Sequence, residues 1–297
     1  MTERTGKVDP IMCFQPLLKV DTHLHLTRDQ MPRKSTYLEM LPHLDALGIE
    51  KGIVLSAGES DRPLGSNETA RAIADNMPDR YAWMCALDFT DPDTIYDRLK
   101  LYKSQGAVGI GEVMINKPFD DPFLETMFRA AGALGLPVTF HMSPEEGYSY
   151  GIVDHPGLPL LEQALQRFPQ TLFVGHSAAF WTEMSADAPK DKEARNAYPQ
   201  GPVIPGGRVP ELFEKYPNLC GDLSASSGGT AIMRDEAFGL AFLERYQDRL
   251  FFATDMVNTQ MRFPLGAWLD EMAAQGKLSE KAYRSICRDN AKRIYGV

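Results

Sequence analysis

The chain has 297 residues, of which 43% are hydrophobic and 24% charged, and its formal net charge is −9. These values are typical of a globular protein, and the acidic balance argues against general binding of nucleic acid or anionic membranes. Cys13, Cys85, Cys220 and Cys287 form no paired motif. This excludes a zinc ribbon or a disulfide framework and suits a reducing, cytoplasmic setting. Residues 1–10 have no apolar core of a signal peptide, and no stretch approaches the ~18 apolar residues of a membrane span.

The first predicted strand, residues 18–24, leads into a His-x-His motif. Residues i and i+2 of a strand point to the same face, so the imidazoles of His23 and His25 can share one metal ion. Short polar pairs of this kind recur by chance, and the motif becomes informative only together with the later strands.

A helix is predicted directly after this strand. Thr36 and Glu39 have the spacing of a capping box, which marks a helix start. Gly48 marks the end, and Pro42 is expected to kink or shorten the helix. The predicted buried side consists of Leu38, Leu41, Leu44 and Leu47.

Apolar runs and amphipathic stretches alternate through the rest of the chain. The predicted strands are 18–24, 52–56, 81–87, 107–113, 136–141, 171–175, 219–223 and 250–253. Further predicted helices are 67–76, 91–102, 122–134, 158–168, 210–216, 236–246, 265–274 and 279–294. Only residues 181–208, which are polar and rich in Pro and Gly, break this rhythm; they are expected to form a long loop that acts as a lid or binding loop.

This alternation predicts a parallel sheet with helices around it. Eight units in this length favour a single (β/α)8 TIM barrel over residues 1–297, with a long loop after strand six and extra C-terminal helices. A doubly wound open sheet is the alternative. It needs a glycine fingerprint after strand one, where this chain has His-Leu-His.

Metal-ligand residue types stand at the ends of the predicted strands. The carboxyl ends of barrel strands converge on one bowl, where active sites lie. His43 and His155 fall elsewhere and are interpreted as surface or supporting residues. The residues at strand ends are His23, His25, Glu112, His141, His176, Asp222 and Asp255.

Imidazole and carboxylate together suit zinc, manganese or iron(II), with one or two ions per chain. Asp255 can both ligate a metal and accept a proton, and His176 can steady an oxyanion or protonate a leaving group. Glu112 either bridges two ions or acts as a supporting base or a partner of Lys117.

Three further residues are candidates for contact with a substrate. Asp222 is interpreted as a hydrogen-bonding or substrate-orienting group rather than a ligand. Arg208 either reaches from the long loop to a substrate carboxylate or forms a surface ion pair. Trp181 either walls the pocket or belongs to the core.

Taken in order, these motifs resemble the amidohydrolase superfamily. The resemblance rests on Asp21-Thr22-His23-Leu24-His25, His141, Gly175-His176 and Thr254-Asp255. The ending Asp289-Asn290-Ala291-Lys292-Arg293-Ile294-Tyr295-Gly296 also resembles the amidohydrolase-related branch, which includes the aminocarboxymuconate-semialdehyde decarboxylases. The resemblance implies a barrel that binds a divalent metal, commonly zinc. It implies His23, His25, His141 and Asp255 as ligands, and His176 as a ligand or an acid/base residue.

The chain departs from the family pattern at two places. Glu112 stands where many binuclear members have a bridging lysine. The decarboxylase branch usually has glycines after its sixth-strand histidine, whereas Ser177 to Trp181 follow His176 here. The second departure favours hydrolysis over decarboxylation.

We therefore expect a metal-dependent hydrolase that cleaves an amide, ester or lactone of a small polar molecule through a metal-activated water. The alternative is a non-oxidative decarboxylase or hydratase on the same metal, and a third hypothesis is a non-catalytic metal-binding barrel. The expected partner is a small molecule rather than nucleic acid or a membrane, and a homodimer is possible through an apolar helix face.

Overall fold

The computed structural model describes residues 14–60 and 64–297. The expectations for residues 1–10 and for Cys13 lie outside these residues. Cys85, Cys220 and Cys287 are free and buried. No helix in the part of the chain that the structure describes is long and apolar enough to cross a membrane.

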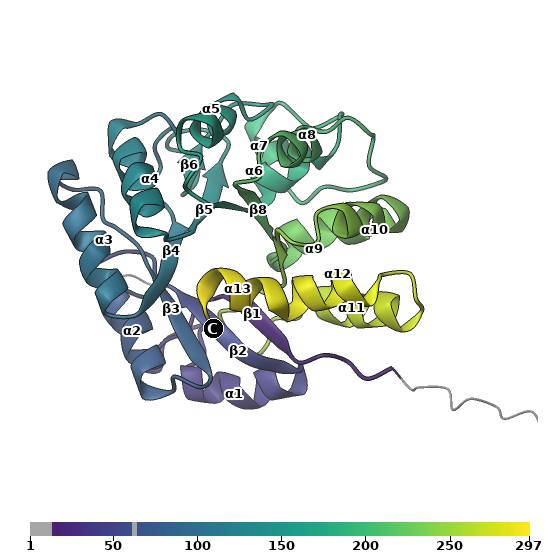
Figure 1. The fold of residues 1–297 in the computed structure, drawn as a ribbon, viewed down its shortest axis with the longest axis horizontal. Coiled ribbons are helices and arrows are strands. Elements are labelled where there is room, and N and C mark those ends of the chain that lie inside the picture. Colours follow the sequence, from purple (N-terminus) through teal and green to yellow (C-terminus); the bar gives the residue numbers. More distant parts are fainter. Residues whose placement is uncertain (1–13, 61–63) are drawn as a thin grey trace, which may run out of the picture.

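Parallel strands form the centre of the molecule (Figure 1). They are rich in buried apolar residues, as expected for strands covered on both faces. The main path runs β1-β2-β3-β4-β5-β7-β8-β9, and the short β6 pairs with β5. The bounds are β1 Lys19–Leu24, β2 Ile49–Leu55, β3 Tyr81–Cys85, β4 Ala107–Val113, β5 Val138–Ser143, β6 Ile152–Val153, β7 Phe173–His176, β8 Leu219–Asp222 and β9 Leu250–Phe251.

The sheet closes between its first strand and the segment after its last. The Thr22 amide donates to the Phe252 carbonyl (3.2 Å), and the Asp255 amide donates to the His23 carbonyl (2.8 Å). A further bridge pairs Leu24 with Met256. These bonds complete the barrel, so the predicted (β/α)8 architecture is confirmed.

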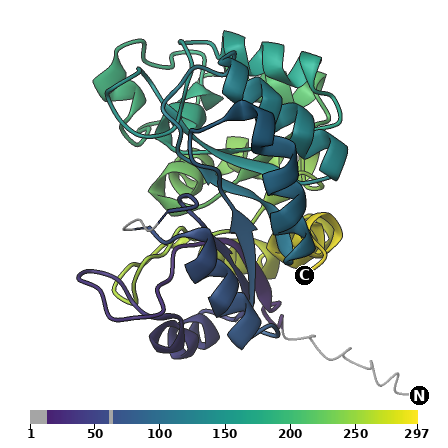
Figure 2. The same ribbon diagram turned by 90° about the vertical axis from the view of Figure 1, so that its left-hand side faces the viewer.

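Helices surround the strands (Figure 1; Figure 2). Those that follow the early strands are α1 Tyr37–Ala46, α2 Asn67–Asn76, the 3-10 turn Pro92–Thr94 with α3 Ile95–Ser104, α4 Pro122–Leu134 and α5 Pro159–Arg167. The Thr36–Glu39 capping box of α1 is present, and the helix continues through Pro42. Its predicted buried side is wrong in part, because Met40 and Leu44 are buried whereas Leu38 is 55% exposed. The face that α1 turns toward the barrel consists of Met40 and Leu44, with Tyr37 and Leu41 packed partly against the core.

The segment between β7 and β8 contains short helices, of which the first ends where the predicted long loop begins. They are α6 Ala178–Trp181, the 3-10 turn Thr182–Met184 and α7 Lys192–Arg195, and α8 Arg208–Lys215 follows. After β8 comes α9 Ala225–Met233, which was not predicted, and then α10 Glu236–Arg245.

The chain ends in helices, of which only the last reaches into the end of the barrel opposite the strand ends that carry the histidines. They are α11 Leu265–Ala274, α12 Glu280–Arg284, a π-helical turn Ser285–Asp289 and α13 Asn290–Tyr295. Ala291 and Tyr295 pack with Val20, Ile53 and Phe251 inside the barrel. The last helix, α13, therefore plugs one end of the barrel and leaves the other for the site, whereas Leu265, Leu269 and Met272 of α11 belong to the larger hydrophobic cluster.

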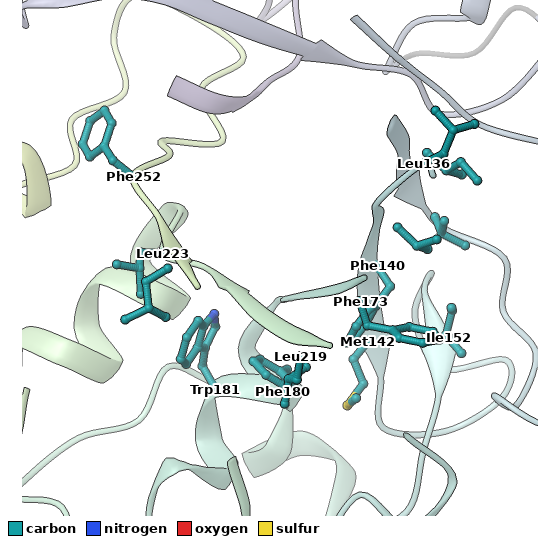
Figure 3. Close-up of a cluster of buried hydrophobic side chains, with 14 of the residues drawn as sticks. Leu136, Phe140, Met142, Ile152, Phe173, Phe180, Trp181, Leu219, Leu223 and Phe252 are labelled. Atoms are coloured by element: carbon teal, nitrogen blue, oxygen red, sulfur yellow. The ribbon is translucent and has the colours of Figure 1, made fainter. Parts of the chain in front are cut away.

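Aromatic side chains fill the layer between the strands and α6 (Figure 3). A side chain on Gly175 would collide with the Phe180 ring (2.4 Å), and one on Gly221 would approach the Trp181 ring (2.9 Å). These two strands therefore need glycine, because the rings of α6 lie directly on their backbones.

Candidate metal centre

Six side chains from five strand ends meet at the carboxyl end of the barrel. Within this group, three sets of potential ligands have atoms within 4.8 Å of one another. The sets are His23–His25–Glu112, Glu112–His141–His176 and His23–His176–Asp255. The topology thus brings together every residue that the sequence suggested as a metal ligand.

The first set is compact enough to share one ion. His23 Nε2 lies 3.1 Å from His25 Nε2, and His25 Nε2 lies 3.3 Å from Glu112 Oε2. Asp255 Oδ1 is 3.5 Å from both imidazole nitrogens. Ligands around one tetrahedral zinc ion are separated by roughly 3.3 Å when the bonds are about 2.0 Å long. The spacing of these four side chains therefore suits one divalent ion.

Glu112 directs its two oxygens to different pairs of histidines. Its Oε2 faces His25 and, at 3.9 Å, His23. Its Oε1 lies 2.7 Å from His141 Nδ1 and 3.5 Å from His176 Nε2. A carboxylate in this position can serve two ions at once.

Asp222 and Ser224 hold two of the imidazoles in place from behind. Asp222 Oδ2 lies 2.6 Å from His23 Nδ1 and Ser224 Oγ lies 2.9 Å from His176 Nδ1. A neutral His23 that donates its Nδ1 proton in a hydrogen bond to Asp222 would present the lone pair of Nε2 to a metal ion. Asp222 is 1% exposed, so it supports His23 and does not face the solvent.

Burial and negative charge act against each other in this cluster. Burial alone would lower the pKa of His23, but the carboxylates of Asp222, Asp255 and Glu112 raise it to about 10. For Glu112, burial opposes ionisation, yet the hydrogen bond and charge of His141 hold its pKa well below the usual range. Without a metal ion, His23 therefore keeps a proton, and this proton offsets part of the negative charge that a cation would neutralise.

The backbone is strained beside several of these residues. Ser177, Ala225 and Asp255 have positive φ angles of 89°, 55° and 60°, and they are three of the five such non-glycine residues in the described chain. Conformations of this kind cost energy and gather at functional sites. Ser177 Oγ accepts from the Met142 amide (3.0 Å) and donates to the Met142 carbonyl (3.1 Å), which ties the end of β7 to β5.

The donor set fits a divalent metal. Nε2 of His23, Nε2 of His25 and the carboxylate oxygens of Glu112 and Asp255 point into one small space, where a divalent cation would neutralise the two carboxylates. Nitrogen and oxygen donors in this mixture suit zinc, manganese or iron(II).

The structure places two predicted substrate residues away from this cluster. Arg208 donates to the Gly157 carbonyl and pairs with Glu162 and with Glu211 (2.8 Å). Its charge is thus compensated within α5 and α8, as in the surface ion-pair interpretation. Trp181 is fully buried and donates to the Asp222 carbonyl (3.0 Å), so it belongs to the core, as in the second of the two interpretations. The other two histidines also lie outside the ligand sets.

Sequence reasoning missed Ser224 and Tyr150. Ser224 stands two residues after Asp222, a spacing that could have suggested a polar turn at the strand end. Tyr150 stacks on the His141 ring at a centroid distance of 4.2 Å, yet it lies in a loop with no periodic pattern. Burial raises the pKa of its hydroxyl, and the charges of Glu112 and Asp255 raise it further.

A cavity of about 270 Å³ adjoins the cluster at Glu112. Most of its walls are apolar and come from the ends of β3 and β4 and from α4. They include Leu87, Phe89, Met114, Ile115 and Met127. The cavity gives room for an apolar group of modest size beside the candidate metal centre.

The family model for amidohydrolases matches residues 20–297. None of the curated proteins matches the chain in sequence. Solved structures resemble it across almost its whole length, but at low identity, so this likeness shows the fold.

Three of these structures illustrate the likeness. 2,6-Dihydroxybenzoate decarboxylase from Rhizobium has 17% identity and a TM-score of 0.59, with 94% of this chain and 99% of that chain covered. 5-Carboxyvanillate decarboxylase from Novosphingobium aromaticivorans, complexed with manganese, has 14% identity and a TM-score of 0.63, with 95% and 96% covered. A probable 2-pyrone-4,6-dicarboxylic acid hydrolase from Acinetobacter baumannii has 14% identity and a TM-score of 0.57, with 95% and 100% covered.

Proposed function

The chain belongs to the amidohydrolase family, and from this we propose that it is a metal-dependent hydrolase of an amide, ester or lactone bond in a small polar molecule. The observation that carries the proposal is the placement of Glu112 between two pairs of histidines. A carboxylate shared by two ions is a device of hydrolytic two-metal sites.

The residues would divide the chemistry among them. His23, His25, His141, His176, Asp255 and Glu112 would hold one or two ions, with zinc or manganese as the first candidates. When bound, a divalent metal lowers the pKa of a coordinated water and polarises a carbonyl.

Asp255 is the best placed of these residues to move a proton. Its side chain is 26% exposed, whereas that of Glu112 is 3% exposed. It can accept a proton at Oδ2 and pass it toward a leaving group. His176 lies 3.8 Å from this oxygen, and burial together with the charge of His23 lowers its pKa. A neutral His176 can hold the carboxylate in position or relay the proton.

Non-oxidative decarboxylation is the second candidate. The named solved structures include more decarboxylases than hydrolases, and this favours decarboxylation by likeness. The same ligands would bind the metal, and an apolar cavity beside Glu112 would suit the ring of an aromatic acid. Against it stands the shared carboxylate, which decarboxylation with one ion does not require.

Metal content and product analysis together test the proposal. Elemental analysis should find about two ions per chain in the wild type and about one in Glu112→Ala. The metal-loaded protein should then hydrolyse members of a panel of esters, lactones and amides. About one ion in both proteins, with CO2 released from aromatic carboxylic acids, would favour decarboxylation. No metal in either, even after reconstitution, would contradict both functions.

A further inference from the structure

Tyr150 lies over the candidate metal centre on the loop between β5 and β6. Its ring meets that of His141 at a centroid distance of 4.2 Å and an interplanar angle of 43°. The residue is 50% exposed. One side of the ring therefore covers a candidate ligand, while about half of the residue stays accessible to solvent.

The adjacent glycine makes this approach possible. Gly151 has a φ of +106°, and a Cβ atom there would lie 2.7 Å from the His141 carbonyl oxygen and 2.8 Å from the His141 ring atom Cδ2. No other residue type fits this close contact between the loop and β5. The sequence Tyr150-Gly151 is thus built to bring the tyrosine onto the histidine.

Hydrogen bonds fix the loop at both ends. The Gly151 amide donates to the Met114 carbonyl (3.0 Å), and Asn116 Nδ2 donates to the Gly151 carbonyl (2.9 Å). Asn116 Oδ1 accepts from the Gly147 amide (2.6 Å). Residues that follow β4 therefore hold the loop, and β6 continues it as a strand paired with β5. Such a loop presents its side chain in one place, as a positioning residue requires.

The Tyr150 hydroxyl has no partner in this arrangement. Among residues 14–60 and 64–297, no side chain or backbone group hydrogen-bonds to it. A phenol that stays protonated can donate one hydrogen bond. An aromatic residue held this firmly with a free donor at the mouth of a metal site is suited to a ligand that supplies an oxygen acceptor.

We propose that Tyr150 is a substrate-positioning residue, whose hydroxyl donates a hydrogen bond to a carbonyl or carboxylate oxygen of the substrate. This inference rests on one part of the proposed function, namely that a substrate with a carbonyl or carboxylate oxygen binds at the metal centre. It applies to hydrolysis and decarboxylation alike.

Cobalt-loaded full-length protein provides a test that needs no known substrate. Acetate is the probe, and its affinity is measured from the change in the cobalt absorption spectrum. Tyr150→Phe keeps the ring on His141 and removes only the hydroxyl, so the cobalt content should equal that of the wild type. The dissociation constant for acetate should rise about ten-fold, as for a lost hydrogen bond to a charged group.

Tyr148→Phe is the matched control. Tyr148 lies on the same loop and is 38% exposed, but its ring faces Lys192. Its variant should bind acetate like the wild type. Equal acetate affinity in all three proteins, or no acetate binding by the cobalt-loaded wild type, would overturn the role of Tyr150 and leave the metal centre standing. Failure of the wild type to bind cobalt would overturn the proposed function as well.

Discussion

The orientation of the imidazoles depends on groups that never reach the candidate substrate. Asp222 accepts the Nδ1 proton of His23, and Ser224 contacts Nδ1 of His176. The Nε2 atoms of both rings are thereby directed into the cluster. Partners of this kind fix the tautomer and basicity of a metal ligand.

Replacing Asp222 by Asn should therefore weaken metal binding without removing a ligand. The amide can present its NH2 group to His23 and favour the wrong tautomer, so we expect a 10- to 100-fold loss of zinc affinity. Competition with a chromogenic chelator measures this loss. Asp248→Asn, an exposed position before β9 at the opposite end of the barrel, should bind zinc like the wild type. Equal affinity in the two variants would mean that Asp222 does not orient His23.

Metal uptake should release protons. Although burial lowers it, the pKa of His23 is raised to about 10 by Asp222, Asp255 and Glu112, so His23 is protonated in the metal-free protein at pH 7. A metal ligand must be deprotonated, so the ion competes with this proton. We expect release of about one proton per ion and an affinity that rises about ten-fold per pH unit below that pKa. Titration calorimetry in buffers of different ionisation enthalpy counts the protons, and a count of zero would contradict the prediction.

At the residue scale, sequence predicts which side chains meet at the strand ends better than it predicts the contacts that support them. His23, His141 and Asp255 stand at strand ends, and barrel topology alone brings strand ends together. Trp181 comes soon after the strand-end residue His176, so sequence alone allows it a place beside the site. In the structure its ring packs against the backbone of Gly221, where the missing side chain leaves room. Tyr150 depends on the fold of an irregular loop, which no periodic pattern encodes.

At the scale of elements, the loop after β6 shows how a helix start can be capped from outside the helix. Leu158, at the start of α5, has a positive φ and no side-chain cap. Asp154 takes this role, because its carboxylate accepts from the amides of Leu160 (3.1 Å) and Leu161 (2.8 Å). Arg195 of α7 donates to the Asp154 carbonyl (2.9 Å), and this bond joins the segment between β7 and β8 to the same loop.

Asp154→Ala should destabilise the protein by about 1–3 kcal/mol, because buried amides at the start of α5 lose their acceptor. Urea unfolding measures the change. Asp121→Ala is the comparison, since Asp121 caps α4 through the Phe123 amide (2.9 Å) at a partly exposed position where water can replace it. A loss for Asp154→Ala no larger than that for Asp121→Ala would contradict the capping role.

Regular elements follow closely from sequence, and irregular ones do not. The prediction for α4, residues 122–134, agrees with the structure because a proline, a buried stripe and Gly135 mark it throughout. The helix α9 was missed, since Ala225–Met233 contains two serines and two glycines, which favour loops in isolation. In the fold, Gly228 packs against the Leu223 backbone, where a Cβ atom would lie 2.6 Å away. Tertiary packing thus outweighs local propensity in this helix.

At the scale of the whole molecule, the candidate metal centre lies on the closing seam of the barrel. His23 lies in β1 and His25 follows it directly, whereas Asp255 follows β9, more than two hundred residues later. Asp21 joins the same two segments, because its carboxylate accepts from Thr254 Oγ1 (2.6 Å) and from the Thr254 amide (3.0 Å). An ion held by these residues would link the first strand to the last.

Removing the metal should therefore lower the stability of the entire barrel. A ligand at 1,000 times its dissociation constant stabilises the native state by about 4 kcal/mol. For a chain of this size that corresponds to a fall in melting temperature of roughly 8 °C on chelation. Scanning calorimetry with and without EDTA measures the fall, and added zinc should reverse it. The double variant His23→Ala/His25→Ala should have the same melting temperature with and without EDTA. If EDTA left the melting temperature of the wild type unchanged as well, the metal would not join the first and last strands. The hydrogen bonds between these strands would then hold them together alone.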